Sequence, residues 1–207
     1  MDRQHHWEVV YQTKRDHEVS WFEGVPEQSL ALLDAAGVTP ASCVLDVGGG
    51  DSRLVDALVD RGFTCVAVLD ISAAALERSR QRLGHAGDHV RWLAVDVVSE
   101  WSIAPVDVWH DRAVFHFLVD DADRRRYRER LVSTLTPGGS AIIATFAEDG
   151  PERCSGLPVR RYSPAALAVE LGDGFALIAS TAHTHETPWG TTQSFQYSRF
   201  RREVATH

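Results

Sequence analysis

Long apolar runs are absent from this chain of 207 residues. A transmembrane helix needs roughly 18 or more consecutive apolar residues, and the sequence contains no such run. Residues 1–17 are polar and charged, unlike a secretory signal peptide. The chain has 44% hydrophobic and 24% charged residues, which is ordinary for a globular domain. We therefore expect one cytoplasmic domain, residues 1–207, without a membrane partner.

Cysteine is scarce as well, with Cys43, Cys65 and Cys154 as the three in the chain. Their spacing lacks the close pairs that bind zinc, and the first two stand in apolar, strand-like runs where buried thiols are common. We therefore predict no disulfide. His183 and His185 would point to one side if a strand runs through them. Together with Cys154 they match no recognised zinc pattern, so we predict no metal site.

Basic residues are fewer than acidic ones, 21 against 29, which gives a formal net charge of −8. This charge disfavours a polyanionic partner. The run 123–130 is rich in arginine, but Tyr127, Leu131 and Leu135 recur at four-residue steps and predict the buried stripe of a helix. The arginines would then form the solvated face of that helix, and we predict no binding of nucleic acid.

The most informative motif is Val44–Ser52, which reads VLDVGGGDS. It places a short apolar strand, a carboxylate and three glycines before a helical pattern. In α/β folds this arrangement brings backbone N–H groups close to a nucleotide-like ligand. Arg53 replaces the third glycine of the dinucleotide fingerprint, and no Gly-Lys-Ser/Thr sequence follows. The motif therefore favours an adenosine-containing ligand without a pyrophosphate.

Apolar runs alternate with helical patterns along most of the chain, which predicts repeated βα units and a mostly parallel sheet. The predicted strands are 43–47, 64–69, 90–95, 106–109 and 140–146. The predicted helices are 27–36, 52–60, 73–83 and 122–135. Ser72 is a plausible N-cap for the third of these helices, and Pro137–Gly139 is expected to end the fourth.

The C-terminal region changes character. Residues 175–181 and 193–200 are two strand-like runs with no helical pattern between them, which predicts an antiparallel pair at one edge of the sheet. Residues 147–161 contain several glycines and prolines and are expected to lack regular structure. Because this segment follows the carboxyl end of a strand, we expect it to line the ligand crevice.

Acidic residues end three successive strand patterns: Asp46, Asp70 and Asp96. A parallel sheet brings such strand ends to the same crevice. Asp70 lies where a carboxylate can accept hydrogen bonds from both hydroxyls of a ribose, and Asp96 where it can bond an adenine amino group. Gly48–Gly50 allow the backbone to approach the ligand closely. One aspartate alone could be a turn or helix cap, but the whole set predicts a cofactor site.

On these residues the chain resembles the class I S-adenosylmethionine-dependent methyltransferases, over roughly residues 40–146. The glycine-rich motif of the family, hydrophobic-D-x-G-x-G, corresponds to Leu45–Gly50. Its acidic ligands for ribose and adenine correspond to Asp70 and Asp96, and its fourth strand motif to Val106–Trp109. The resemblance implies a Rossmann-like, doubly wound α/β fold. Its sheet would have seven mostly parallel strands, an antiparallel C-terminal strand pair and helices on both faces.

The resemblance also implies an organisation and a cofactor. Residues 1–39 would form a helical cover, 40–146 the cofactor-binding core, and 147–207 the crevice loop and C-terminal strands. The cofactor would be S-adenosylmethionine, with S-adenosylhomocysteine as the product. The implied cofactor residues of the core are Asp46, Gly48, Gly49, Gly50, Asp70, Ile71, Asp96, Val97, His110 and Asp111.

Two further resemblances point to different branches of this family. The segment 108–117 resembles the Asp-Arg-Ala strand-end motif of thiopurine and related thiol methyltransferases. Trp7, Tyr11 and Trp21 resemble aromatic residues with which a group of protein-lysine methyltransferases contacts the cofactor. Equally, these aromatic residues could simply pack on the first helix.

Methyl transfer from a sulfonium is an in-line displacement, which mainly requires orientation of the reactants in a water-poor site. His110 or His116 could accept a proton from the methyl acceptor, with structural hydrogen bonding as the alternative for each. Arg112 could pair with Asp111 or bind an acidic substrate. We count His110, Arg112 and His116 as the candidate catalytic residues.

The sequence therefore favours a methyltransferase that acts on a small molecule such as a thiol or other soft nucleophile. A protein-lysine methyltransferase is the alternative among enzymes, so a protein substrate stays open, because this fold hosts many acceptors. A non-catalytic domain that binds a nucleoside or a partner is the alternative from another class.

Overall fold

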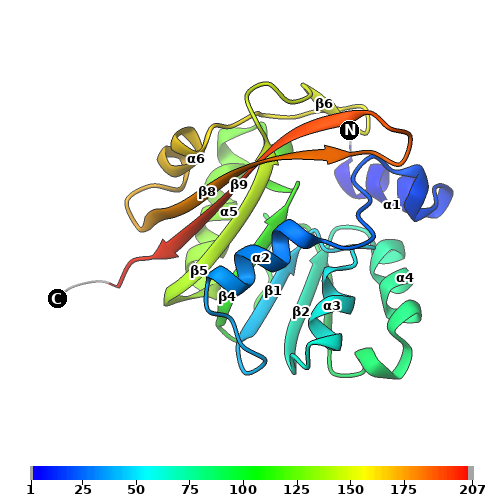
Figure 1. Cartoon of the computed structure of the whole chain (residues 1–207), viewed down its shortest axis with the longest axis horizontal. Coiled ribbons are helices and arrows are strands. Elements are labelled where there is room, and N and C mark those ends of the chain that lie inside the picture. Colours follow the sequence, from blue (N-terminus) through cyan, green and yellow to red (C-terminus); the bar gives the residue numbers. More distant parts are fainter. Residues whose placement is uncertain (1, 205–207) are drawn as a thin grey trace.

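A computed structural model describes residues 2–204 (Figure 1). Its main sheet consists of β1 (Cys43–Val47), β2 (Cys65–Asp70), β3 (Arg91–Ala94), β4 (Val106–Arg112), β5 (Leu135–Phe146), β8 (Phe175–Glu186) and β9 (Thr192–Arg202). The strand order is β3-β2-β1-β4-β5-β9-β8. Strands β1 to β5 are parallel, whereas β9 runs antiparallel to both of its neighbours. This arrangement confirms the Rossmann-like fold and the antiparallel C-terminal pair.

Helices lie on both faces of the sheet. The α-helices of the described residues are α1 (Arg3–Thr13), α2 (Glu27–Ala35), α3 (Leu54–Asp60), α4 (Ala73–Leu83), α5 (Asp121–Thr134) and α6 (Pro164–Leu171), and all but α1 pack on a face of the sheet. Helices α2, α3 and α4 cover one face, and α5 and α6 the other (Figure 1). Successive strand side chains alternate between faces, so Val44 packs in the core of α2 to α4 and Leu45 in the core of α5 and α6. Both side chains are fully buried.

Helix α1 lies apart from these two layers. It packs against α4, at the end of the sheet where the parallel strands finish (Figure 1). Asp2 caps its N-terminus by accepting hydrogen bonds from the Gln4 and His5 backbone N–H groups. The helix therefore stands over the edge at which the three predicted strand-end acids were expected.

Several predicted boundaries shift in the structure. Ser72 caps α4, as predicted, by accepting a hydrogen bond from the Ala75 N–H. The turn at Pro137–Gly139 does not separate a helix from a strand, because β5 begins at Leu135. Instead, the pairing of β5 with β4 changes register between Leu135 and Ser140. Gly138, with φ +80°, allows the backbone to deviate there.

The C-terminal part is more regular than the sequence indicated. Residues 147–161 contain a small hairpin, β6 (Arg153–Cys154) and β7 (Leu157–Pro158), where no regular structure was predicted. Helix α6 was missed, although its start carries two standard signals. The Ser163 hydroxyl accepts a hydrogen bond from the Ala166 N–H, and Pro164 occupies the first turn.

The arginine-rich helix is only partly as predicted. Tyr127 and Leu131 are buried in the core, which confirms the apolar stripe of α5. The expectation that its arginines are all solvated is wrong for Arg124, whose side chain is 3% exposed. Its guanidinium pairs with Glu170 of α6 at 2.6 Å and donates to the carbonyl oxygen of Leu118. This arginine joins two helices on one face of the sheet.

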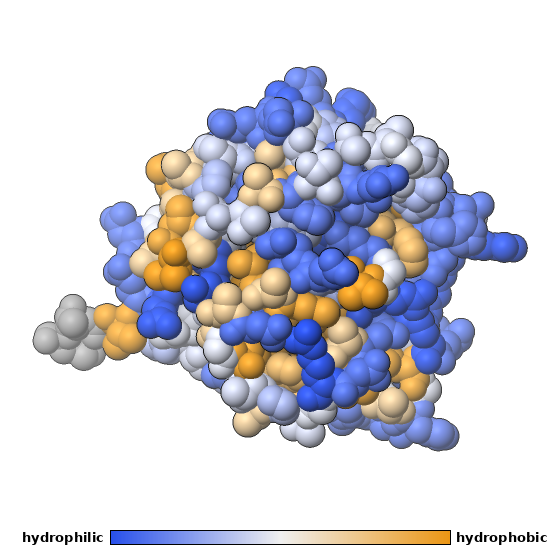
Figure 2. Space-filling model, viewed as in Figure 1, coloured by the Kyte–Doolittle hydropathy of each residue, from blue (hydrophilic) through white to orange (hydrophobic). Residues whose placement is uncertain are grey.

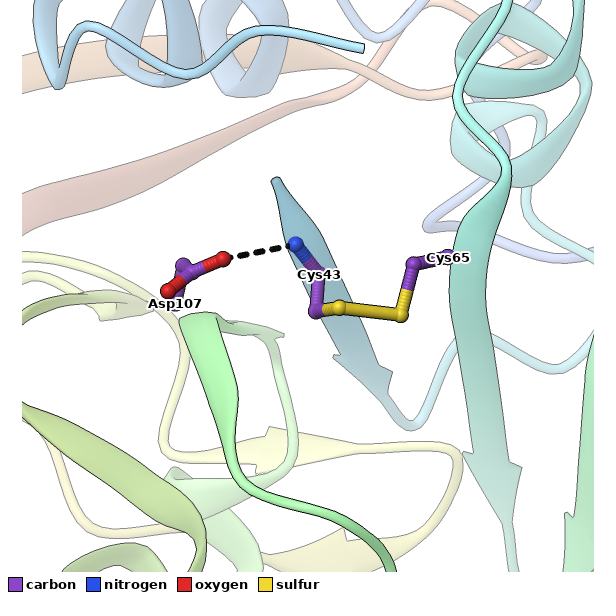
Figure 3. The surroundings of a disulfide bond; sticks show 3 residues. All are labelled: Cys43, Cys65 and Asp107. Atoms are coloured by element: carbon purple, nitrogen blue, oxygen red, sulfur yellow. Dashed lines mark hydrogen bonds between the residues drawn. A yellow bond between two sulfur atoms is a disulfide. The ribbon is translucent and has the colours of Figure 1, made fainter. Parts of the chain in front are cut away.

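The prediction of no disulfide is wrong, because Cys43 and Cys65 are bonded to each other (Figure 3). They begin β1 and β2 and are direct partners in the parallel register, with Cα atoms 4.6 Å apart. The residues are only partly buried and exposed, respectively, so the assumption of two buried thiols failed. The Cys43 N–H also donates to the Asp107 carboxylate at 2.8 Å, and this cluster lies at the amino ends of the strands.

The surface in the view of Figure 2 is mixed. Hydrophilic residues cover much of it, and apolar residues gather in smaller areas among them. Among residues 2–204, no helix is long and apolar enough to cross a membrane.

Candidate functional site

The glycine turn after β1 meets the ends of β2 and β4. The Gly48 N–H donates to the Leu69 carbonyl oxygen at 2.6 Å, and Gly48 has φ +69°. A Cβ atom at Gly48 would lie 2.0 Å from a methyl carbon of Val114. At Gly50 it would lie 2.7 Å from an oxygen of Asp70. The turn therefore accepts only glycine and lies directly against the carboxylate that ends β2.

A cavity of about 830 Å³, including the space at its mouth, opens at this edge of the sheet. Of the predicted cofactor residues, its wall contains Trp7, Tyr11, Trp21, Gly48, Asp70, Ile71, Asp96 and Val97. A second cavity, of about 650 Å³, adjoins Asp46, Gly49 and His110, and shares Tyr11, Trp21, Gly48 and Arg112 with the first. Most of the predicted site is thus brought together.

Asp70 is the most perturbed acid of the first cavity. Burial raises its pKa to about 7, and the nearby carboxylates of Asp46 and Glu8 act in the same direction. One carboxylate oxygen accepts a hydrogen bond from the Ser72 N–H at 2.8 Å. Asp70 therefore offers a buried carboxyl group at the cavity wall that would gain from further hydrogen-bond donors.

Asp96 stands two residues beyond the end of β3 and is tied to the cover. Its carboxylate lies 3.1 Å from the guanidinium of Arg3, the first residue of α1. Arg3 also contacts Asp123, at the start of α5, at 2.9 Å. Glu8 of α1 accepts a hydrogen bond from the Ser72 hydroxyl at 2.8 Å. Helix α1 is therefore held over the cavity by polar links to three different elements.

Aromatic residues close the cavity from above. The ring of Trp7 lies 5.5 Å from that of Trp21 and 5.1 Å from that of Phe117, both in edge-to-face geometry. Tyr11 is buried, and burial raises the pKa of its phenol well above the usual range. Trp7, Tyr11, Trp21 and Phe117 all line the first cavity, a position from which they could contact a bound cofactor.

His110 is held at both ring nitrogens. Nδ1 lies 2.7 Å from a carboxylate oxygen of Asp46, and Nε2 lies 2.9 Å from the hydroxyl oxygen of Ser29. The side chain is almost completely buried and borders the second cavity, not the first. The other oxygen of Asp46 is buried without a hydrogen-bond partner among residues 2–204. His110 therefore orients Asp46 and has no free nitrogen with which to accept a proton.

Asp111 is part of the fold rather than of the cavity wall. Its carboxylate accepts hydrogen bonds from the Val114 N–H at 2.9 Å and from the Tyr127 hydroxyl at 2.6 Å. Burial raises its pKa to about 6. These bonds fix the turn after β4, in which Ala113 has φ +69°. The geometry thus assigns Asp111 to the support of the wall formed by Ala113 and Val114, and not to contact with a cofactor.

Arg112 borders both cavities and is fully engaged. Its guanidinium donates to the Tyr197 hydroxyl at 2.9 Å, to the Trp21 carbonyl oxygen at 2.9 Å and to the Glu23 carboxylate at 2.7 Å. It also lies over the ring of Phe195, 5.1 Å from the centroid. Arg112 therefore ties the chain segment of Trp21 to the sheet, and its predicted pairing with Asp111 is not formed.

His116 lies next to the cavity but not in its wall. Its Nδ1 accepts a hydrogen bond from the Phe146 N–H at 3.2 Å, and Nε2 is buried without a partner among the described residues. Burial lowers its pKa to about 3, and the charge of Arg112 adds to this. A base with so low a pKa takes up a proton poorly at neutral pH.

Several residues of the first cavity were not predicted. Phe117, Phe146 and Phe195 line it, together with Cys154 of the crevice segment and Gln193 of β9, and we refer to these five residues as the aromatic end. Burial raises the pKa of the Cys154 thiol to about 11. These residues come from distant parts of the chain, and no motif joins them. The position of 147–161 after a parallel strand was the single signal, and it correctly placed Cys154 at the cavity.

Comparisons with known proteins agree with this geometry. A family model described as "Methyltransferase domain" matches residues 45–141. An uncharacterized methyltransferase of Mycobacterium tuberculosis (strain ATCC 25618 / H37Rv) is 37% identical over 117 residues, which are 56% of this chain and 56% of that protein. An eEF1A lysine and N-terminal methyltransferase of Mus musculus is 23% identical over 150 residues, 69% of this chain and 21% of that protein. The match thus spans about half of the mycobacterial relative's length.

Solved structures share the fold over nearly the whole chain. One, titled "Conversion of a Disulfide Bond into a Thioacetal Group during Echinomycin Biosynthesis", has a TM-score of 0.79 at 20% identity and covers 98% of this chain and 94% of its own. The N-methyltransferase NodS from Bradyrhizobium japonicum WM9 with S-adenosyl-L-homocysteine has a TM-score of 0.74 at 17% identity, covering 98% and 100%. The sequence match and the shared fold together confirm the resemblance to the class I S-adenosylmethionine-dependent methyltransferases.

Proposed function

We propose that this chain transfers a methyl group from S-adenosylmethionine to a small molecule. The observation that carries the proposal is the buried carboxyl group of Asp70, set against the glycine turn in the wall of a covered cavity. Two further features fit the cofactor. One oxygen of Asp46 is buried without a partner among residues 2–204, and a Cβ atom at Gly48 or Gly50 would collide with a neighbouring side chain.

The chain offers a distinct group for each polar part of this cofactor. Asp70 would accept hydrogen bonds from the ribose hydroxyls, and Asp96, with Ile71 and Val97 beside it, would hold the adenine. The Gly48–Gly49 backbone and the second cavity would take the methionine part. When bound, the cofactor supplies an electrophilic methyl group on a sulfonium. Trp7, Tyr11 and Trp21 would exclude water above it, which favours a displacement reaction.

The other end of the first cavity supports a small, flat acceptor. Three phenylalanine rings line it, whereas the two acids of the wall, Asp70 and Asp96, come from the cofactor end. Gln193 also lines this end, and its amide oxygen is buried without a partner among residues 2–204. It can therefore accept a hydrogen bond from an N–H or O–H of the acceptor.

Among residues 2–204, none of the histidine and cysteine side chains next to the aromatic end is a free base near neutral pH, which favours a soft nucleophile. Both nitrogens of His110 are engaged, His116 is a weak base, and the Cys154 thiol stays protonated because burial raises its pKa to about 11. An acceptor must therefore reach the site in its nucleophilic form. A thiol meets this condition, since its usual pKa of about 8.5 leaves some thiolate at neutral pH. The charge of Arg112 would favour that anion.

A protein-lysine methyltransferase is the second candidate, because the aromatic residues of the N-terminal segment do cover the cavity, as in the group they resemble. A lysine side chain must lose its proton before it can attack a methyl group. The aromatic end of the cavity offers it three phenylalanine rings and a neutral amide. None of these groups can take up the proton of a lysine ammonium group, so we prefer a small-molecule acceptor.

Calorimetric titration tests the cofactor part of the proposal. We expect S-adenosylmethionine and S-adenosylhomocysteine to bind to the wild-type protein, and NAD to bind weakly or not at all. Asp70→Ala should weaken binding by about 100-fold, because two hydrogen bonds to a carboxylate are lost. Asp60→Ala is the matched control, since Asp60 is exposed at the end of α3 and should bind like wild type. Equal binding by Asp70→Ala would contradict the proposal.

Transfer of a labelled methyl group tests the acceptor. A panel of aromatic thiols, amines and phenols, and a cell lysate as a source of proteins, would be compared. We expect label in small thiols and a lower rate for Gln193→Ala with acceptors that carry an N–H or O–H group. Labelling of a discrete protein band, with the label recovered in methyl-lysine after hydrolysis, would instead establish the lysine alternative. Cofactor binding without any transfer would indicate the non-catalytic binding domain.

A further inference from the structure

Two histidines and a glutamate meet at a third hollow, and the glutamate, Glu23, also lines the second cavity. His183 and His185 lie on the edge strand β8, two residues apart and on one side of it, as predicted for a continuing strand. Glu23 belongs to the segment between α1 and α2 that also contains Trp21. Nδ1 of His185 is 3.5 Å, and Nε2 of His183 is 4.0 Å, from the same oxygen of Glu23. This Glu23–His183–His185 cluster borders a hollow at the protein surface.

The hydrogen bond between His185 and Ser20 determines which ring nitrogen of His185 carries the proton. The other nitrogen faces Glu23 with its lone pair. Its Nε2 lies 2.6 Å from the carbonyl oxygen of Ser20, which can only accept a hydrogen bond. Nε2 therefore carries the proton, and in the neutral ring Nδ1 presents its lone pair to a carboxylate oxygen. Two electron-rich atoms at this distance repel. Arg112 donates to the same oxygen of Glu23 and offsets part of this repulsion, and a positive charge between the two atoms, a second proton or a metal ion, would remove it. The side chain of His185 is only 4% exposed, so water screens this repulsion poorly.

The distances match those of a metal site. Zinc binds imidazole nitrogen and carboxylate oxygen at about 2.0–2.2 Å, so ligand atoms of a tetrahedral site lie about 3.4 Å apart. The observed 3.5 and 4.0 Å to Glu23 are close to this value, and the ligand atoms of all three residues lie within 4.8 Å of one another. The side chain of His183 is 32% exposed, so it has room to move toward the other two. The bond from His185 to a backbone carbonyl is the usual partner of a metal-binding histidine. The open hollow leaves the fourth position to water.

Charged residues around the cluster have opposing effects on the binding of a cation. Arg112 donates to Glu23 at 2.7 Å and thereby fixes the carboxylate, but its charge opposes a nearby cation. Glu27 and Glu186, which also line the hollow, act in favour of a cation. The sequence predicted no metal because the two histidines alone match no zinc pattern, and Glu23 comes from the opposite end of the chain.

We propose that Glu23, His183 and His185 bind a divalent transition-metal ion of the zinc type. The ion would link the segment of residues 20–23, which carries Trp21 over the first cavity, to the edge strand β8. Its role would be to hold this part of the cover in place, so it is a structural and regulatory site. It is independent of the proposed methyl transfer.

Titration of the purified, metal-free protein with zinc tests this site without any assay of activity. We expect one equivalent to bind, and Co²⁺ to give the visible absorption of a site with nitrogen and oxygen ligands. His183→Ala should weaken zinc binding at least about tenfold, and the partly exposed position should tolerate the change. His85→Ala is the matched control, because His85 is fully exposed and far from the cluster in the sequence. It should bind zinc like wild type.

Hydrogen exchange gives the second measurement. Zinc should slow the exchange of backbone amides in residues 19–25 of the wild-type and His85→Ala proteins, but not of His183→Ala. Two results would overturn the proposal: no zinc binding to the wild-type protein, or equal binding and equal protection in His183→Ala.

Discussion

The floor and the cover of the first cavity are built in different ways. The floor consists of strand ends and the glycine turn, so main-chain geometry places Gly48 and Asp70. The cover, residues 3–26, is held by side-chain links such as Arg3 to Asp96 and Arg112 to Glu23. Changes in the floor should therefore affect cofactor binding directly, whereas changes in the cover should act through its closure. The effect of a change on cofactor affinity should decrease from the floor, through the cover, to the amino ends of the strands.

Gly50→Ala should have the largest effect. The added methyl group would lie 2.7 Å from an oxygen of Asp70, so the carboxylate must move. We expect cofactor affinity to fall about 100-fold, which corresponds to the usual free energy of overpacking. Gly62→Ala is the matched control: Gly62 has φ +80° and open space around it, so it shares the backbone strain without the clash. It should lower stability by about 1 kcal/mol and leave affinity unchanged. Equal effects on affinity would contradict this account of the floor.

A change of pH should have the next largest effect on cofactor affinity. Burial raises the pKa of Asp70 to about 7, and the protonated form is a poorer acceptor for ribose hydroxyls. Affinity should therefore fall about tenfold per pH unit below 7 and level off above it. Asp70→Asn should bind weakly with a flat profile over this range. A wild-type profile that stays flat between pH 5 and 8 would show that Asp70 does not titrate as described.

The same raised pKa acts on folding with the opposite sign. The ordinary pKa of Asp70 is 3.8, and the folded value is higher. Its contribution to stability is therefore fully present below pH 4 and is lost as the pH rises through about 7. Denaturant unfolding of Asp70→Asn beside wild type isolates this contribution. The variant should gain in relative stability as the pH increases from 5 to 8.

Arg112→Ala tests the cover. It would leave the half-buried carboxylate of Glu23 without its guanidinium partner and free the Trp21 carbonyl oxygen. We expect a loss of stability of about 3 kcal/mol, typical of a broken buried ion pair, but only a several-fold loss of cofactor affinity. Trp21 should become more accessible to a fluorescence quencher. Arg125→Ala, on the exposed side of α5, is the control. A loss of affinity as large as that of Gly50→Ala would remove the distinction between floor and cover.

Reduction of the Cys43–Cys65 bond should have the smallest effect on affinity. The bond joins residues 22 apart at the amino ends of β1 and β2, away from the glycine turn. Its loss should lower the free energy of unfolding by about 3 kcal/mol, as chain entropy predicts for a loop of this length. Cofactor affinity should stay within about twofold. Cys65→Ser with and without reductant is the control, since it should no longer respond to the reductant.

The difference between the floor and the cover also explains which features could be predicted from the sequence. The floor follows from local patterns: an apolar run, an acid at its end and a glycine turn, as at Asp46 and Asp70. The parallel sheet and its antiparallel edge follow from the same patterns. The links of the cover join residues far apart in the chain, such as Arg112 and Glu23, and no local pattern contains them. For the same reason the sequence did not reveal the engaged nitrogens of His110 or the pairing of Cys43 with Cys65.

The buried carboxyl group of Asp70 has one further consequence, which rests on the proposed function. If the ionised form binds the cofactor and the empty site is half protonated near pH 7, each binding event must release part of a proton to the solvent. The heat of binding would then include the ionisation heat of the buffer. The measured enthalpy should differ between phosphate and Tris at pH 7 and converge near pH 9. Protons from the solvent would thereby compete with the cofactor for the carboxylate of Asp70.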